Sequence, residues 1–220
     1  MTFVRNIEDK PRGSIRDFVY IRENTLSESF CEHVINRFNH DGRKRDGVIG
    51  HTSNRVDKNV KDTKDLKISG LDDWVEEDNT FYESLREGLD EYYEYLEKIN
   101  EGICNAFPNT SFTTNDTGYK VQMYEPGGTY HWHHDWSMSS DPVASRIFTF
   151  MWYLNTIDEK DDGYTEFADG TKIQPVAGKQ IFFPATWTYI HRGYPSKVNK
   201  YLCNGWIFSR PSESMEQIND

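Results

Sequence analysis

The sequence lacks the long apolar runs and leader-like patterns of membrane and secreted proteins. No run of apolar residues approaches the ~20 that an α-helix needs to span a bilayer. The first residues, MTFVRNIEDKPRGS, do not follow the basic-then-apolar order of a secretion signal. The chain of 220 residues is long enough for one domain with a sizeable core. These features predict a single soluble, cytoplasmic domain spanning 1–220.

Basic clusters and cysteine motifs are scarce as well. The net charge is −11 and no Lys/Arg run is longer than RKR at 43–45, which disfavours nucleic acid as a partner. Cys31, Cys104 and Cys203 are far apart and form no CxxC pair, so we expect reduced, largely buried thiols. The sequence also contains neither the GxSxG motif of serine hydrolases nor a P-loop.

The first half of the chain combines a short predicted strand with two predicted helices. The stretch DFVYIREN (17–24) is typical of a strand. Thr25 and Glu28 fit a capping box that would begin a helix ending near Asp41. A second apolar stripe at helical spacing predicts a helix over about 79–107. These helices are expected to support a separate β-rich core.

Residues 43–78 form a polar stretch with no clear period. Such a pattern predicts a long loop, and loops of this length within a domain are often functional. Gly47, Gly50 and Gly70 could act as hinges. We expect this segment to be a mobile lid over the functional site, with a plain solvated surface loop as the alternative.

From Gly118 onward, short β-type runs alternate with turn residues. They are YKVQMY, TYHWHHD, RIFTFMWYLN, GYTEF, TKIQPV, KQIFFPA, TYIHRG and KYLCNGWIF. Eight short strands at this spacing predict a sandwich, jelly roll or barrel. We predict a mainly β fold with N-terminal α: a double-stranded β-helix (jelly roll, cupin-like) over 118–210, supported by the helices and lid segment of 1–117.

The stretch YHWHHDWS holds three of the seven histidines of the chain. Side chains alternate along a strand, so His131, His133 and Asp135 would share one face while His134 points the other way. His131-x-His133 would begin a cupin-type metal site. His133-x-Asp135 with a distant histidine, for which His191 is available, would make the 2-His-1-carboxylate triad of non-haem iron oxygenases. Taken alone, His133 and Asp135 could also be a turn-capping ion pair.

Six motif pieces occur in order around these residues. They are Y-x-x-G-x-x-Y-x-x-H-x-D from Tyr124, R-x-x-T-x-x-x-Y-L-N from Arg146, G-x-T-x-F from Gly163, P-x-x-G-x-x-x-x-F from Pro175, H-x-G-x-P from His191 and K-Y-x-x-x-x-W from Lys200. Over about 118–208 the chain resembles the 2-oxoglutarate- and Fe(II)-dependent dioxygenases, in particular the prolyl 4-hydroxylase-like branch. Asp162-Gly163 stands where that branch commonly has Gly-Gly.

The resemblance implies roles for most of the matching residues. His133, Asp135 and His191 would bind Fe(II), and Lys200 would pair with the distal carboxylate of 2-oxoglutarate, with Lys197 as the second choice. Tyr124, Tyr153 and Trp206 would line the co-substrate pocket, or be ordinary core aromatics. Arg146 and Thr149 match the motif without an assigned role.

The resemblance also implies the reaction. An unactivated C–H bond would be hydroxylated with release of succinate and CO₂, and ascorbate is the expected accessory reductant. The acceptor would be a prolyl residue of a peptide or protein, or alternatively a free amino acid or small metabolite. A non-catalytic jelly-roll binding module and a cupin-type metalloenzyme are the rival classes.

Overall fold

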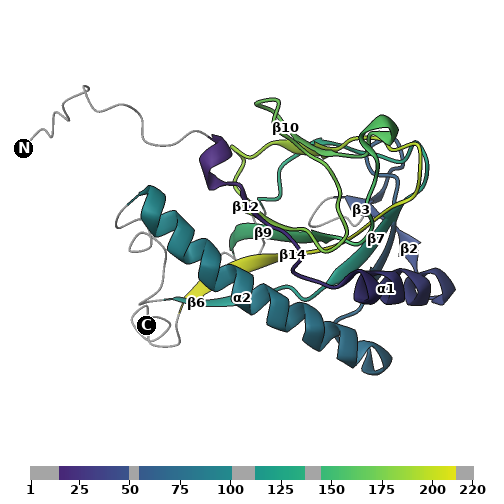
Figure 1. The fold of residues 1–220 in the computed structure, drawn as a ribbon, viewed down its shortest axis with the longest axis horizontal. Helices are drawn as coiled ribbons and strands as arrows, with labels where there is room; N and C mark the ends of the chain where they lie inside the picture. The colour runs from purple at the N-terminus through teal and green to yellow at the C-terminus, as the bar shows by residue number, and fades with distance from the viewer. Residues whose placement is uncertain (1–14, 50–54, 101–111, 137–144, 212–220) are drawn as a thin grey trace, which may run out of the picture.

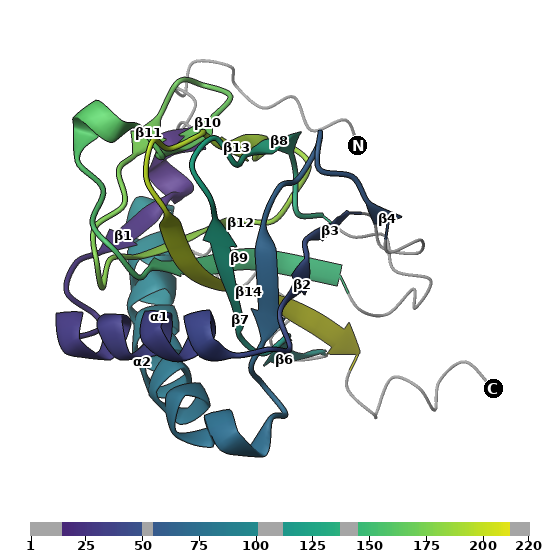
Figure 2. The ribbon, with the colours of Figure 1, turned by 90° about the vertical axis from the view of Figure 1, so that its right-hand side faces the viewer.

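Two antiparallel sheets face each other, and two helices pack on the outer side of the larger sheet. The computed structural model describes residues 15–49, 55–100, 112–136 and 145–211. Figure 1 shows the helices below the large sheet and the small sheet, marked by β10, above it, and the quarter-turn in Figure 2 shows the same three layers. Within these residues, no helix is long and apolar enough to cross a membrane.

The large sheet is built around its two longest strands, which pair with each other over nearly their whole length. β14 lies between β9 and β7, and this pairing brings Trp206 opposite Thr149. The strand order is β1 (Tyr20–Arg22), β12 (Gln180–Pro184), β9 (Ser145–Tyr153), β14 (Lys200–Pro211), β7 (Lys120–Tyr124), β5 (Lys64–Lys67) and β2 (Arg45–Asp46), with β6 (Phe112–Asp116) also beside β14.

The small sheet supplies the opposite wall. Its strand order is β11 (Lys172–Ile173), β10 (Thr165–Phe167), β13 (His191–Gly193) and β8 (Tyr130–His133). A separate antiparallel pair consists of β3 (Val48–Ile49) and β4 (Arg55–Val56). Two facing antiparallel sheets of this kind are the jelly roll that the strand spacing predicted, so the predicted fold class is confirmed. The space between the sheets is the interior in which a site can be built.

The helices begin at positions that differ from the predictions. α1 (Glu28–His40) begins after Ser27, whose Oγ accepts a hydrogen bond from the N–H of Phe30 at 3.2 Å. Thr25 instead donates its hydroxyl to the carbonyl oxygen of Gly178 at 2.9 Å, so the predicted capping box is wrong. α2 (Val75–Ile99) starts before residue 79, and residues 101–107 of the predicted helix lie outside the described ranges. Short 3₁₀ turns are η1 (Ile15–Phe18), η2 (Asp72–Trp74) and η4 (Glu159–Asp161).

Alternation along β9 divides the core into two layers. Phe148, Phe150 and Trp152 pack toward the helices, whereas Met151 and Tyr153 pack between the sheets. Burial of an aromatic or large aliphatic side chain stabilises a fold by about 1.5–3 kcal/mol, so both layers contribute strongly. Cys31 and Cys203 are buried free thiols in the helix-side layer, as predicted, and Cys104 lies outside the described residues.

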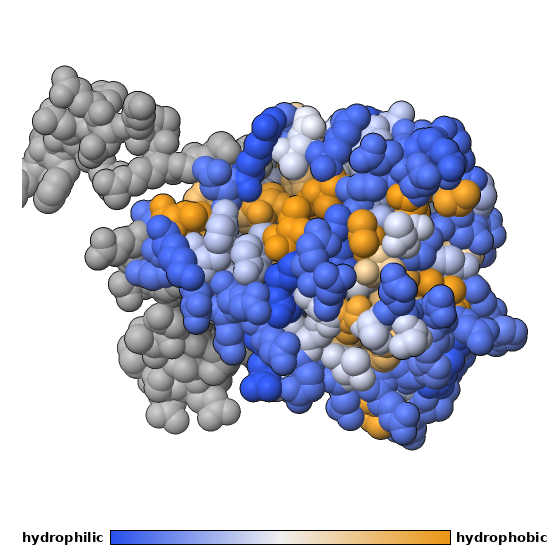
Figure 3. Space-filling view, viewed as in Figure 1, coloured by the Kyte–Doolittle hydropathy of each residue, from blue (hydrophilic) through white to orange (hydrophobic). Residues whose placement is uncertain are grey.

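The face of the molecule seen in Figure 3 is mostly hydrophilic. Apolar side chains gather on it between η1 and α2. A hollow of about 440 Å³ in this part of the structure has Phe18, Leu96 and Pro184 among its lining residues.

The segment 43–78 is not the unstructured loop that its polar sequence predicted. Its described residues contain β2, β3, β4, β5, η2 and the start of α2. β5 pairs with β7 inside the large sheet, where Leu66 lies opposite Val121 and is buried. The prediction failed because β5, KDLK, is too short and too polar to show a strand period.

Candidate metal and co-substrate site

Pairing within the small sheet brings together two histidines that are far apart in the sequence. β8 and β13 are antiparallel neighbours, and His133 lies opposite His191 with their ring centroids 4.3 Å apart. Asp135 follows two residues after the end of β8 and is buried. The ring of Tyr130 stacks on His133 at 3.5 Å and restrains its orientation.

These three side chains form a compact group of potential ligands. The Nε2 of His133 lies 3.8 Å from one carboxylate oxygen of Asp135, and the Nε2 of His191 lies 3.7 Å from the other. One ligand atom from each residue lies within 4.8 Å of the others, and no second group of this kind occurs in the described ranges. The donor set is that of the 2-His-1-carboxylate triad, which leaves coordination positions open.

Hydrogen bonds to the backbone orient both imidazoles for metal binding. The Nδ1 of His133 lies 2.7 Å from the carbonyl oxygen of His131, and the Nδ1 of His191 lies 3.0 Å from that of Tyr189. A carbonyl oxygen only accepts, so each Nδ1 carries a hydrogen. In a neutral ring each Nε2 then keeps its lone pair and lies near Asp135, which is the arrangement that such hydrogen bonds give to metal-binding histidines.

The surroundings of His133 and Asp135 favour the protonation states that a metal needs. Burial, together with the nearby His191, lowers the pKa of His133 well below its ordinary value. Burial acts to raise the pKa of Asp135, but the two histidines and a hydrogen bond from Thr149 Oγ1 (2.7 Å) hold it below the usual range. Neutral imidazoles beside an ionised carboxylate suit Fe(II).

The neighbouring histidines lie outside this group. His131 is exposed and contributes its backbone carbonyl to His133, while its side chain does not line the cavity. His134 borders the cavity but is exposed and belongs to no potential ligand group in the described residues. The cupin-type alternative therefore has no support in this geometry.

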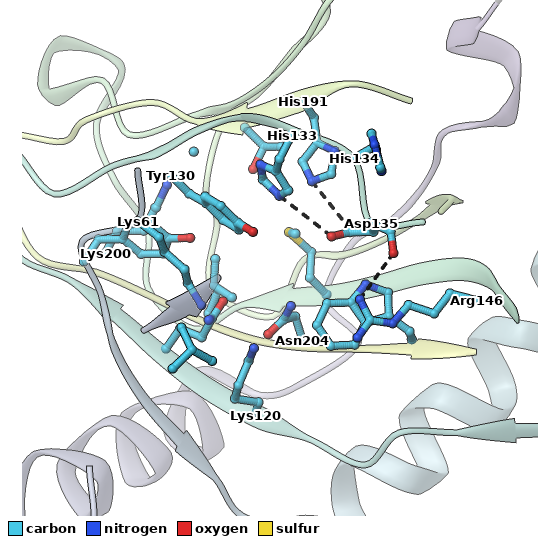
Figure 4. Close-up of a pocket in the computed structure, with 18 residues that line it drawn as sticks. Lys61, Lys120, Tyr130, His133, His134, Asp135, Arg146, His191, Lys200 and Asn204 are labelled. Carbon is cyan, nitrogen blue, oxygen red and sulfur yellow. Dashed lines mark hydrogen bonds and ion pairs between the residues drawn. The ribbon is translucent and has the colours of Figure 1, made fainter. Parts of the chain in front are cut away.

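A cavity of about 270 Å³ opens beside the triad, between the two sheets. Figure 4 shows His133, His191 and Asp135 at one side of it and Lys120 and Asn204 across from them. Its lining residues are Val48, Lys61, Lys120, Gln122, Tyr124, Tyr130, His133, His134, Asp135, Arg146, Met151, Thr165, His191, Gly193, Lys200, Leu202, Asn204 and Trp206.

Lys200 is a buried cation that faces this cavity without a carboxylate partner in the described residues. It is 1% exposed, its Nζ donates to the carbonyl oxygen of Gly163 at 3.0 Å, and it lies 4.4 Å from the ring centre of Tyr124. Burial alone lowers the pKa of Lys200 to about 7. Lys197, by contrast, is 63% exposed, donates to the carbonyl of Lys160 and lies 3.6 Å from a carboxylate oxygen of Asp162.

The absence of a side chain at Gly193 leaves room in front of this lysine. A Cβ built at Gly193 would lie 3.4 Å from the Nζ of Lys200 and 3.5 Å from the hydroxyl of Tyr124. Burial raises the pKa of Tyr124 well above its ordinary value, so the phenol keeps its proton and can donate. An ammonium and a phenol that converge on open space fit a carboxylate such as that of 2-oxoglutarate.

The other two predicted pocket residues have different positions. Trp206 lines the cavity, and the guanidinium of Arg146 stacks on it at 3.6 Å while donating to the backbone carbonyl of Asp135 at 3.2 Å. Tyr153 lies behind the lining residue Thr165, and its hydroxyl donates to the Thr165 hydroxyl at 2.6 Å. Its phenol is thus engaged within the protein.

Sequence reasoning missed several polar residues of the cavity. Lys120, Gln122 and Tyr124 are spaced two residues apart on β7. Side chains at this spacing share one face of a strand, so the sequence could have predicted that all three line the cavity. Asn204 follows from Lys200 by the same rule along β14. The sequence gives no comparable signal for Lys61. This residue belongs to the polar segment 43–78 and is held beside the cavity by an isolated bridge to Tyr130.

The structure combines a jelly roll with a 2-His-1-carboxylate group, the donor set of non-haem iron oxygenases. Residues 119–208 match the profile of the 2OG-Fe(II) oxygenase superfamily. The match covers less than half of the chain; together with the His133–Asp135–His191 group it supports Fe(II) and 2-oxoglutarate as the metal and co-substrate. A comparison with curated proteins gives no significant match.

Several solved structures share the fold. A prolyl hydroxylase from Trichoplax adhaerens, in complex with a hypoxia-inducible-factor peptide fragment, has a TM-score of 0.66 and 19% identity over 87% of this chain and 84% of that one. The viral collagen prolyl hydroxylase of Paramecium Bursaria Chlorella virus-1, as a 2OG complex, has a TM-score of 0.56 and 22% identity over 87% and 96%. A Pseudomonas putida prolyl-4-hydroxylase has 0.59 and 16% over 87% and 95%.

Proposed function

We propose that this protein is a 2-oxoglutarate-dependent prolyl hydroxylase that acts on a prolyl residue of a peptide or protein. The observation that carries the proposal is that one cavity is bordered both by the His133–Asp135–His191 group and by buried Lys200, which has no carboxylate partner in the described residues. The prolyl hydroxylases that share the fold, one of them bound to a peptide fragment, support this acceptor over others.

Each group of the cavity would have a defined task. His133, Asp135 and His191 would hold Fe(II), which together with 2-oxoglutarate supplies the activation of O₂ that hydroxylates a C–H bond and releases succinate and CO₂. Lys200 and Tyr124 would fix the distal carboxylate of the co-substrate and so orient it. Thr149 and Arg146 restrain Asp135 through its carboxylate and its backbone carbonyl.

Turnover with defined acceptors tests the proposal. Purified protein is supplied with Fe(II), 2-oxoglutarate and ascorbate, and succinate formation is measured against proline peptides, free amino acids and small metabolites. We expect proline peptides to stimulate succinate formation, with one hydroxyl added to proline for each succinate. Stimulation only by free amino acids or metabolites would transfer the activity to the alternative acceptor class. No succinate under any condition would favour a non-catalytic binding module.

A further inference from the structure

The side chains around the cavity carry more positive than negative charge, and binding of Fe(II) and 2-oxoglutarate would not change this balance. The net charge of the chain is −11, yet four cationic side chains border the cavity and only two carboxylates lie at or next to it. The cations are Lys61, Lys120, Arg146 and Lys200, and the carboxylates are Asp65 and Asp135. A divalent metal and a dianionic co-substrate would cancel each other. Because the two carboxylates offset only two of the four cations, the loaded site would keep a surplus of positive charge.

The surplus lies at the end of the cavity away from Lys200. In the pairing of β14 with β7, Lys200 lies opposite Tyr124 and Asn204 lies opposite Lys120. The two lysine positions are therefore four residues apart, or about 13 Å at ~3.3 Å per residue. The carboxyl carbons of 2-oxoglutarate are at most about 6 Å apart, since four C–C bonds of about 1.5 Å join them. A co-substrate held between Lys200 and the metal leaves Lys120 for another ligand.

Lys120 is only partly neutralised by its neighbours. Its Nζ lies 3.7 Å from a carboxylate oxygen of Asp65, but that same oxygen already accepts a 2.7 Å hydrogen bond from Lys61. The Nζ of Lys120 also lies 5.1 Å from the ring centre of Trp206, on which Arg146 stacks as well. Two cations thus flank one indole in the wall of the cavity, with a single shared carboxylate behind Lys120.

Polar groups beside Lys120 are also without partners. Gln122, 3% exposed, has no hydrogen-bond partner for its side-chain nitrogen in the described residues, and Asn204, 8% exposed, has none for its side-chain oxygen. The Asn204 oxygen is an acceptor, so of these two atoms only the Gln122 nitrogen can donate to a carboxylate. Both residues line the cavity. A buried amide N–H without an acceptor is costly unless a ligand or water satisfies it. A carboxylate placed here would accept from Gln122 and pair with Lys120.

We propose that the primary substrate carries a carboxylate near the carbon that is hydroxylated, and that Lys120 and Gln122 bind this carboxylate. The inference rests on the proposed function for the location of Fe(II) and 2-oxoglutarate, and it narrows the acceptor to an acidic one. The carboxylate is either the side chain of an acidic residue next to proline in a peptide or the main-chain carboxylate of a free amino acid.

Matched probes that differ only in a carboxylate test this inference by binding. The peptide probes are N-acetylated, C-amidated Glu-Pro-Gly against Gln-Pro-Gly and Gly-Pro-Glu against Gly-Pro-Gln; the free amino acid pair is L-proline against L-prolinamide. Calorimetry measures their Kd with Fe(II) and 2-oxoglutarate bound and O₂ excluded, so that no turnover is needed. We expect the carboxylate member of at least one pair to bind about tenfold more tightly or better, because a charge-assisted hydrogen bond is lost in its amide. The pair that responds identifies the source of the carboxylate.

Variants assign the effect to Lys120. Lys120→Met should reduce the preference to less than about threefold, Lys120→Arg should retain most of it because the charge is kept, and the exposed Lys197→Met should leave it unchanged. Equal binding within every pair, including no binding by either member, overturns the inference, as does a preference that survives Lys120→Met. Succinate formation in air is measured separately, so a failure of the proposed hydroxylation is distinguishable from a failure of the carboxylate subsite.

Discussion

At the scale of single residues, Asp135 is the acidic member of the candidate ligand group. Asp135→Ala should abolish succinate formation and weaken Fe(II) binding by more than the roughly 10- to 100-fold that loss of an outer hydrogen-bond partner causes. His131→Ala is the matched control, because His131 is exposed and serves the site through its backbone carbonyl, which alanine keeps. Metal titration of both variants measures the difference. Weak metal binding by His131→Ala with normal binding by Asp135→Ala would contradict the assignment.

Lys200 allows a prediction that separates co-substrate binding from metal binding. Lys200→Ala should raise the KM for 2-oxoglutarate about 10- to 100-fold, since a charge-assisted hydrogen bond contributes about 1.5–3 kcal/mol. Fe(II) affinity should stay nearly unchanged, because Lys200 contacts Gly163 and Tyr124 rather than the ligand group. Lys197→Ala should behave as the wild type. If Lys197→Ala raises the KM and Lys200→Ala does not, the other lysine binds the co-substrate.

Burial of Lys200 also predicts how co-substrate affinity depends on pH. Its pKa is lowered to about 7, so the ammonium is present below that pH and is lost above it. Binding of the 2-oxoglutarate dianion should therefore be tightest below about pH 7 and weaken by up to about tenfold for each pH unit above it. Lys200→Arg should bind with little pH dependence over this range, because a guanidinium stays charged. Equilibrium binding with O₂ excluded measures both, and a flat wild-type profile would refute the role of the ammonium.

At the scale of secondary-structure elements, the first helix tests which residue caps it. Ser27→Ala should destabilise the protein by about 1 kcal/mol, because the N–H of Phe30 loses its acceptor. For a chain of this size that corresponds to a fall in Tm of about 2–4 °C. Glu32→Ala, at an exposed position further along the same helix, should change stability by less than about 0.5 kcal/mol. Thermal unfolding compares the two, and equal effects would remove the capping role of Ser27.

The sequence predicted elements well where burial is regular. The apolar positions of α1, α2 and β9 repeat at helical or strand spacing because each element packs one or both faces against core residues. β5 was missed because its order within the sheet comes from pairing with β7 and not from an apolar pattern of its own. Helix starts were missed by a few residues, because several side chains near Ser27 could have served as the cap.

At the scale of the whole molecule, the candidate site combines what sequence can and cannot predict. His133 and Asp135 are close in the chain, so strand parity alone places them together. His191 reaches them only because β13 pairs with β8, and the resemblance of motifs, rather than any local pattern, indicated that partnership. Tyr153 shows the limit of the resemblance: it has the expected position in the strand, yet its hydroxyl is bound to Thr165. The cationic end of the cavity depends on contacts between the segment that holds Lys61 and residues of β5, β7, β9 and β14.

The segment 43–78 yields the last prediction. The lid hypothesis requires this segment to be mobile, whereas the pairing of β5 within the large sheet requires that part of it to be ordered. The backbone amides of β5 should exchange slowly with solvent even without metal, 2-oxoglutarate or substrate, since β5 pairs with β7 on one side and β2 on the other. Deleting 62–69 should unfold the protein. The deletion removes buried Leu66 and Ile68, each worth about 1.5–3 kcal/mol, along with the pairing to β7, against a total stability of about 5–15 kcal/mol.

Hydrogen exchange measured by mass spectrometry separates the two views. Fast exchange across 64–67 that slows only when substrate is added would show that β5 moves as part of a lid, and a folded, active deletion variant would lead to the same conclusion. Slow exchange of the amides of 64–67 in all states would restrict any ligand-dependent motion to the residues before β5. For those residues the lid hypothesis stays a prediction. Val48, in β3, lines the cavity, so that shorter part of the segment remains in reach of a bound substrate.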